Sequence, residues 1–164
     1  KKASSIILLA DSSITRTEQD TDARTILAAH LVKQLAPSAY ICAEIMSEDN
    51  KSALMTTGVN EYVVTSSYTG VLLATCTKQP GITGVFNALL QQNDGSELNK
   101  VPVPKQLLGK TFLEGSTILL NEYNSILIGI ERYKKLFINP KKTESLKQED
   151  FLIVIDSNLK KKLN

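Results

Sequence analysis

Histidine is nearly absent from this chain of 164 residues, in which it occurs once, as His30. Zinc centres and Ser-His-Asp or Cys-His catalytic groups depend on histidine. His30 falls within a predicted helix, where we expect a partly buried structural residue. Glycine-rich phosphate loops are missing too, because the two glycines of "GITG" at 81–84 have the wrong spacing and follow a proline. We therefore expect a protein that is not an enzyme.

An excess of charge of one sign is also missing, because 19 basic and 17 acidic residues leave a formal net charge of +2. No basic stripe with interleaved aromatic residues occurs, so nucleic acid is not an expected partner. The lysines that cluster do so in "NLKKKLN" at 158–164. We interpret the segment 157–164 as a solvated basic tail.

The sequence contains no apolar run long enough to span a bilayer and no recognisable signal peptide. It has two cysteines, Cys42 and Cys76, without the spacing of a disulfide framework. This favours a reducing, cytosolic compartment. The first residue is Lys1 rather than methionine, so we expect the chain to be part of a longer protein.

What the first half does contain is an alternation of strand and helix patterns. The apolar segment at 5–10 ends at Asp11 and is typical of a strand buried on both faces. A helix with Asp20 or Thr21 as its cap comes next. The predicted elements are, in order, a strand at 5–10, a helix at 21–36, a strand at 39–45, a short helix at 47–58 and a strand at 60–65. Such alternation predicts an α/β lobe with a parallel sheet.

The second half begins with two apolar helices, at 67–79 and 81–92. We expect them to cover the sheet or to contact another subunit, because they are too apolar to remain in water. Turn residues then indicate a linker at 93–101. Beyond it, a small α+β lobe is predicted over 102–156. Its elements are an extended segment at 100–110, a helix from Thr111 with Glu114 in capping-box register, and strands at 125–132, 135–139 and 150–156.

Two acidic residues come at the carboxyl ends of strands, where open parallel sheets bind ligands. Asp11 follows the first strand, and Glu44 is the one charge in "YICAEI". Neighbouring strands lie about 4.8 Å apart, so the two carboxylates need a cation nearby. That cation is either a divalent metal ion such as Ca²⁺ or the guanidinium of Arg16 or Arg24. In the simplest arrangement Glu44 pairs with an arginine and Asp11 orders the polar loop, while Arg24 is also placed to reach a phosphate.

The order of these segments resembles that of RCK domains, the regulators of potassium conductance. The first lobe carries the strand ending in aspartate, a helix, a strand with "AE", and "SEDNKSALMTTGVNEYVV" at 47–64. The second carries "LLGKT" at 107–111, "ILIGIER" at 126–132, "NP" at 139–140 and "DFLIVID" at 150–156. The resemblance covers residues 5–156. It implies a Rossmann-like N-lobe at 1–92, whose first strands are missing from this chain, and a C-lobe at 102–156.

The resemblance also implies a ligand. In calcium-gated members of the family, an aspartate at the position of Asp11 and a glutamate at the position of Glu44 hold the activating ion. A second glutamate normally stands two residues further on, where this chain has Met46, a soft thioether and a poor calcium ligand. Other relatives bind NAD, adenine nucleotides or cyclic dinucleotides, so the ligand stays open between Ca²⁺ and a nucleotide, with Arg16 and Arg24 as candidate phosphate contacts.

Function and partners follow from the same resemblance. The helices at 67–92 correspond to the region through which RCK domains dimerise, and paired domains form a ring, expected to be octameric, beneath a pore at the cytoplasmic face of the cell membrane. We therefore predict a ligand-sensing gating domain of a potassium channel. The alternatives are a peripheral regulatory subunit of a potassium-uptake transporter and a fragment of a dinucleotide-dependent oxidoreductase.

Overall fold

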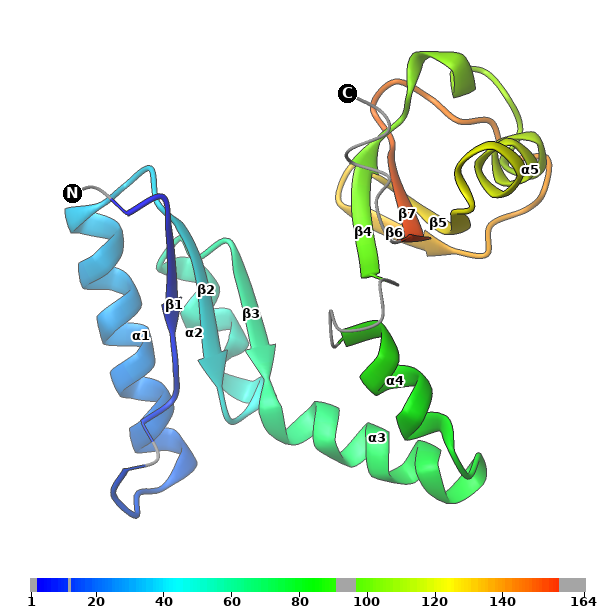
Figure 1. Cartoon of the computed structure of the whole chain (residues 1–164). Coiled ribbons are helices and arrows are strands. Elements are labelled where there is room, and N and C mark those ends of the chain that lie inside the picture. The colour runs from blue at the N-terminus through cyan, green and yellow to red at the C-terminus, as the bar shows by residue number, and fades with distance from the viewer. Residues whose placement is uncertain (1–2, 12, 91–96, 157–164) are drawn as a thin grey trace. The chain divides into compact units, whose positions relative to one another are not determined.

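The chain folds into two compact units, residues 1–80 and 81–164, each with its own sheet and its own core (Figure 1). The computed structural model describes residues 3–11, 13–90 and 97–156. The predicted basic tail and the first part of the predicted linker lie outside these residues. In the described part of the chain, no helix is both long and apolar enough to cross a membrane.

The sheet of the first unit has three parallel strands in the order β1–β2–β3. These are β1 (Ser5–Leu8), β2 (Tyr40–Ile45) and β3 (Glu61–Val64). Leu8 is paired with Ala43, and Glu44 is paired with Val63. The carboxyl ends of the three strands therefore meet at one edge, which confirms the predicted α/β lobe with a parallel sheet.

Helices cover one face of this sheet. They are α1 (Glu18–Leu35) and, after a 3₁₀ turn at Glu48–Asn50, α2 (Lys51–Thr56). Ala29 of α1 and Leu54 of α2 are fully buried in one cluster with Ile41, Ala43 and Ile45 of β2.

The other face of the sheet is bare within the described residues. There Ile7 and Val63 are 72% and 43% exposed. The prediction that the first strand is buried on both faces is therefore wrong for the described residues, because Ile7 is exposed on this face and Ile6 and Leu8 are only half-buried on the other.

Helix α1 begins earlier than predicted. Thr17 caps it, rather than Asp20 or Thr21, because the Thr17 hydroxyl accepts a hydrogen bond of 3.2 Å from the Asp20 backbone N–H. Asp20 then lies in the first turn, where a negatively charged side chain interacts favourably with the helix dipole. His30 lies on this helix as predicted, but its ring is exposed and shares a hydrogen bond of 2.9 Å with Gln34, so it is not partly buried.

The two apolar helices α3 (Thr65–Lys78) and α4 (Ile82–Leu90) contain no buried residue. Among their described side chains, Tyr68, Leu73 and Leu90 are exposed by more than half. Of the two roles predicted for these helices, covering a sheet is therefore not observed. Contact with another subunit stays a prediction.

The second unit is an antiparallel sheet in the order β4–β7–β5–β6 with one long helix. Its elements are β4 (Glu97–Pro102), a 3₁₀ turn (Lys105–Leu107), α5 (Phe112–Tyr123), β5 (Ile126–Arg132), β6 (Lys135–Ile138) and β7 (Phe151–Asp156). Because β4 pairs with β7 from Glu97 onward, residues 97–101 of the predicted linker belong to a strand. The core side chains are Val101, Leu107, Phe112, Leu119, Leu127, Ile130, Leu146, Leu152 and Val154.

Helix α5 starts with the predicted capping box. The Thr111 backbone N–H donates to Glu114 Oε2 at 2.7 Å, and the Glu114 backbone N–H donates to Thr111 Oγ1 at 3.3 Å. These two bonds satisfy N–H groups that a helix start otherwise leaves unpaired. The helix ends at Asn124, in the left-handed conformation with φ 54°.

Candidate ligand site at the strand ends

A cleft of about 430 Å³ lies at the carboxyl edge of the parallel sheet. Its polar lining consists of three carboxylates, one guanidinium, one thioether and three hydroxyls: Asp11, Glu18, Glu44, Arg16, Met46, Thr15, Thr21 and Thr65. The sequence predicted Asp11, Glu44, Arg16 and Met46 for this edge. Arg24, the remaining candidate, does not line the cleft.

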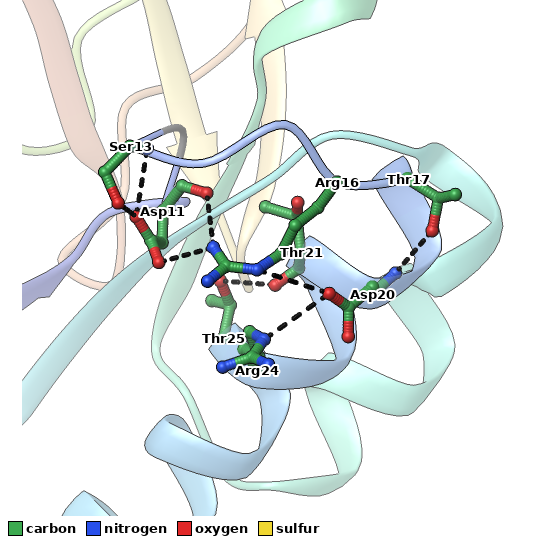
Figure 2. A network of polar contacts seen from close by, with 8 residues as sticks. All are labelled: Asp11, Ser13, Arg16, Thr17, Asp20, Thr21, Arg24 and Thr25. Carbon is green, nitrogen blue, oxygen red and sulfur yellow. Dashed lines mark hydrogen bonds and ion pairs between the residues drawn. The ribbon is translucent and has the colours of Figure 1, made fainter.

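Asp11 is held by donors from the loop that follows it (Figure 2). The backbone N–H of Ser13 donates to Asp11 Oδ1 at 3.1 Å, and the Ser13 hydroxyl donates to the same oxygen. The Arg16 guanidinium donates to Asp11 Oδ2 at 2.6 Å. The hydrogen bonds of Ser13, followed by that of Arg16, lower the pKa of Asp11 from 3.8 to about 2.

Arg16 links Asp11 to the first turn of α1. Its Nε lies 3.4 Å from Asp20 Oδ2, and the same oxygen lies 3.5 Å from Arg24 Nε. The four side chains thus form a chain of alternating charge, Asp11–Arg16–Asp20–Arg24, as Figure 2 shows. The Arg16 side chain is 14% exposed and the Arg24 side chain 58%, so the network runs from the cleft to the surface.

Glu44 lies opposite, at the end of β2, and both of its carboxylate oxygens have donors. The Ala10 backbone N–H donates to Oε2 at 3.0 Å, and the Thr65 hydroxyl donates to Oε1 at 2.5 Å. The predicted pairing of an arginine with Glu44 is therefore wrong, because the arginine pairs with Asp11 instead. The other part of the prediction is confirmed, because Asp11 orders the polar loop through its bonds to Ser13 and Arg16.

Asp22 is a residue that the sequence did not single out. Its buried carboxylate accepts hydrogen bonds from the backbone N–H groups of Met46 at 2.7 Å and Ser47 at 3.0 Å, and from the Asn50 side chain at 2.7 Å. These bonds fix the chain after β2 and with it the position of Met46. An aspartate near a helix start usually indicates only a favourable dipole interaction, so no local signal distinguished it.

The side chains that line the cleft offer few ligands to a metal ion. Carboxylate oxygens are the hard ligands that Ca²⁺ prefers, usually six to eight of them, and the Met46 thioether is not. Within the described residues, no group of three or more His, Cys, Asp and Glu side chains is placed to hold a metal ion. Asp11 and Glu44 thus supply suitable oxygens, each of which already accepts a hydrogen bond.

Comparisons with known proteins give the family. The family model of Castor and Pollux, part of voltage-gated ion channel, matches residues 67–163, more than half of the chain. The calcium-gated potassium channel TvoK of Thermoplasma volcanium is 20% identical over 159 residues, which are 96% of this chain and 45% of TvoK. The chain therefore spans about half the length of this curated relative.

One solved structure gives the fold. The human SLO3 gating ring matches 96% of this chain and 33% of its own at a TM-score of 0.78 and 16% identity. The GsuK channel bound to NAD is 21% identical over 95% of this chain and 26% of its own, at a TM-score of 0.41. The likeness to the SLO3 gating ring supports the predicted fold class, an α/β lobe followed by a small α+β lobe. The chain belongs to the Castor and Pollux family, part of voltage-gated ion channel, and it has the fold of an RCK domain.

Proposed function

We propose that this chain is a cytosolic, ligand-sensing gating domain of a potassium channel. The observation that carries the proposal is the family match to a part of an ion channel over residues 67–163. The similarity to TvoK, named a calcium-gated potassium channel, supports it along nearly the whole chain. Both favour a channel over a peripheral subunit of a potassium-uptake transporter. They also favour a regulatory domain over a fragment of an oxidoreductase, so the domain is not an enzyme.

The proposal includes assembly at the cytoplasmic face of the membrane. The SLO3 structure is named a gating ring, and copies of this domain are proposed to form dimers and an octameric ring joined to the pore. The exposed apolar side chains of α3 and α4, among them Tyr68, Leu73 and Leu90, support this because such surfaces are usually covered. Ligand binding then favours one arrangement of the paired domains and thereby one state of the pore.

The proposed ligand is Ca²⁺ or a nucleotide such as NAD. At the cleft, the carboxylates of Asp11, Glu18 and Glu44 outnumber the single guanidinium of Arg16, which favours a cation over a phosphate there. Asp11 and Glu44 are the proposed cation ligands. A nucleotide phosphate is left with Arg16 and Arg24, both of which already pair with acids.

The test is patch-clamp recording of the full-length protein with Ca²⁺, NAD, ATP, ADP and cyclic di-AMP applied in turn to the cytosolic side. If the proposal holds, one ligand changes the open probability, and Asp11→Asn or Glu44→Gln raises the Ca²⁺ concentration required. Asp49→Asn is the matched control, because Asp49 is an exposed acid near the end of β2 that does not line the cleft. If the open probability does not change with any of these five ligands, the sensing role is contradicted.

A further inference from the structure

Strand β6 forms one edge of the C-lobe sheet. In the order β4–β7–β5–β6 it pairs with β5 on one side, and no strand of the described residues pairs with its other side. Its three apolar side chains, Leu136, Phe137 and Ile138, are 53%, 37% and 56% exposed. Such an edge offers unpaired backbone groups together with apolar side chains, which is the kind of surface to which another strand can be added.

The backbone groups of β6 that point outward follow from its pairing with β5. The backbone N–H of Asn139, directly after β6, donates to the Ile128 carbonyl at 2.9 Å. In an antiparallel pair, every second residue of a strand directs its N–H and C=O toward the neighbouring strand. The odd-numbered residues of β6 therefore face β5, whereas the N–H and C=O groups of Leu136 and Ile138 face away from the sheet.

The side chains of β6 alternate between the two faces of the sheet. Phe137 is paired with Ile130, a buried core residue, and so lies on the face that carries the core. Leu136 is paired with Glu131 and lies on the opposite face, as does Ile138 two positions later. A strand added beside β6 would thus meet apolar side chains on both faces, so its own central residues should be apolar.

Lysines border this apolar edge in the sequence. Lys134 and Lys135 come at the start of β6, and Lys141 and Lys142 follow shortly after its end. All four are exposed, and none forms an ion pair with an acid of the described residues. The Lys135 ammonium instead lies 5.3 Å from the centre of the Phe137 ring. The edge therefore carries unpaired positive charge, which favours an acidic partner.

We propose that the free edge of β6 is the docking site for an extended segment of a partner protein, in which acidic residues flank a short apolar stretch. The segment adds to the four-stranded sheet beside β6, through the outward backbone groups of Leu136 and Ile138, and its acids lie near the lysines. This inference goes beyond the proposed gating role, because it identifies a protein partner at a surface that has no part in the ligand cleft.

The same lysines argue against a second copy of this chain as the occupant. If two β6 edges paired in antiparallel fashion, Lys134 and Lys135 of one copy would approach the end of β6 in the other copy, which Lys141 and Lys142 follow. Like charges brought together across a strand pair are destabilising. Lysines on an edge strand are a common means of keeping identical edges apart, and they do not hinder an acidic segment.

The turn before β6 keeps the edge in position. Tyr133 and Lys134 have φ values of 50° and 63°, and they form a two-residue turn whose twist suits a hairpin. The Tyr133 hydroxyl donates to Glu149 at 3.2 Å, and Arg132 is held by Asp150. Strand β6 is therefore extended and in register before a partner arrives, which lowers the conformational cost of binding.

The experiment measures the binding of a fluorescein-labelled peptide, Asp-Glu-Val-Ile-Val-Thr-Glu-Asp, to the full-length protein by fluorescence anisotropy. The peptide should bind, and a version with lysines in place of its acids should bind about tenfold more weakly, because its charges are repelled. Two further versions are N-methylated at alternate amides, one for each edge of the peptide. The version whose methyl groups face β6 should bind about tenfold more weakly, and the other should bind about as well as the parent.

Matching changes in the protein test the same contacts. Leu136→Pro removes an outward N–H without removing a bond to β5, and it should weaken peptide binding about tenfold. Lys141→Glu should weaken binding about threefold, because it repels the acids of the peptide. Lys105→Glu is the matched control, since the exposed Lys105 follows β4 at the opposite edge of the sheet, and the affinity should stay within about twofold.

Two results with the wild-type protein would overturn the inference even if Leu136→Pro folds poorly, as shown by its thermal midpoint. If both methylated versions bind as tightly as the parent peptide, the lysines attract any acidic chain and no strand is added. If the version with lysines binds as tightly as the parent, charge does not select the partner.

A third result would also overturn the inference. If the parent peptide does not bind and Leu136→Pro forms a smaller assembly than the wild type in sedimentation velocity, the edge is an interface between copies of this chain. Absence of peptide binding without that change contradicts the docking role as well. None of these results depends on how the current responds to Ca²⁺ or nucleotides, so they leave the proposed function to its own test.

Discussion

Arg132 and Asp150 form a two-point ion pair in the C-lobe, with Nε donating to Oδ1 at 2.6 Å and Nη2 donating to Oδ2 at 2.8 Å. The Asp150 side chain is fully buried. Arg132 also donates to Glu144 Oε1 at 2.7 Å and to the Ser145 carbonyl at 2.9 Å. The guanidinium at the end of β5 therefore fastens the segment before β7. Burial on its own raises the pKa of Asp150, but the hydrogen bonds from Arg132 and the Lys147 backbone hold that pKa below its ordinary value.

Breaking the ion pair of Arg132 and Asp150 should lower the free energy of unfolding. Asp150→Asn leaves Arg132 without its fully buried partner, and such a loss costs about 3 kcal/mol of unfolding free energy. Urea denaturation at pH 7 measures the effect. Glu149→Gln is the matched control, because the exposed Glu149 accepts a hydrogen bond of 3.2 Å from the Tyr133 hydroxyl at the surface, and its loss should change stability by less than about 0.5 kcal/mol. Equal losses in the two variants would show that the pair does not hold the segment.

The acid titration of Asp11 gives a second prediction. Because its pKa is about 2 in the folded chain, against an ordinary 3.8, the folded chain binds this proton less readily than the unfolded chain. The stability that Asp11 contributes is therefore full above 3.8 and is lost as the pH falls toward about 2. An NMR titration of the ¹³C-labelled side-chain carboxyl reports this pKa directly.

The same titration identifies the cause of the shift. Ser13→Ala should raise the pKa of Asp11, because the Ser13 hydroxyl is the largest contributor to its lowering. Thr15→Ala, a loop neighbour that lines the cleft without a hydrogen bond to Asp11 in the described residues, should leave the pKa unchanged. A wild-type pKa at or above 3.8 would refute the hydrogen-bonded arrangement of Figure 2.

Asp22 gives the third prediction. Asp22→Asn keeps the volume of the side chain but turns one acceptor oxygen into a donor that faces other donors. Stability should fall by about 2 kcal/mol, the cost of disrupting buried hydrogen bonds to a charged group. Differential scanning calorimetry of Asp22→Asn and of Asp49→Asn, an exposed acid in the segment that Asp22 holds, separates this effect from a simple change of net charge. A midpoint unchanged from the control would contradict the anchoring role.

The order of the elements was predictable because it depends on local patterns. Apolar runs gave the three parallel strands, and the Thr111–Glu114 spacing gave the start of α5, since a capping box lies within four residues of chain. The start of α1 was not predictable in the same way. Thr17, Asp20 and Thr21 are all good cap residues, and what decides between them is the packing of Thr21 and Asp22 against the rest of the unit.

The site was predictable in its location but not in its pairing. Parallel pairing of β1 with β2 necessarily brings Asp11 and Glu44 to the same edge, and this follows from the order of the strands. Which acid takes the arginine depends on the path of the loop before Thr17, for which the sequence holds no periodic signal. The bonds of Asp22 join residues 24 to 28 positions apart, so no local pattern reveals them.

The packing of α5 gives the last prediction. A Cβ at Gly115 would lie 2.7 Å from Leu146 Cδ1, which belongs to a fully buried side chain of the C-lobe core, so one of the two must shift. Gly115→Ala should therefore destabilise the protein by about 1–3 kcal/mol, although alanine favours a helix. Gly70→Ala on α3 is the matched control, because nothing lies within 4 Å of its Cβ position, and it should stabilise by about 0.5–1 kcal/mol.

Urea denaturation of the two glycine variants decides between crowding and helix propensity. If propensity dominated at Gly115, both substitutions would stabilise the protein, and the close approach of α5 to Leu146 would carry no energetic weight. A double variant tests the contact itself. Leu146→Val shortens the side chain that the new methyl group meets, so Gly115→Ala combined with Leu146→Val should lose less stability than the sum of the two single losses.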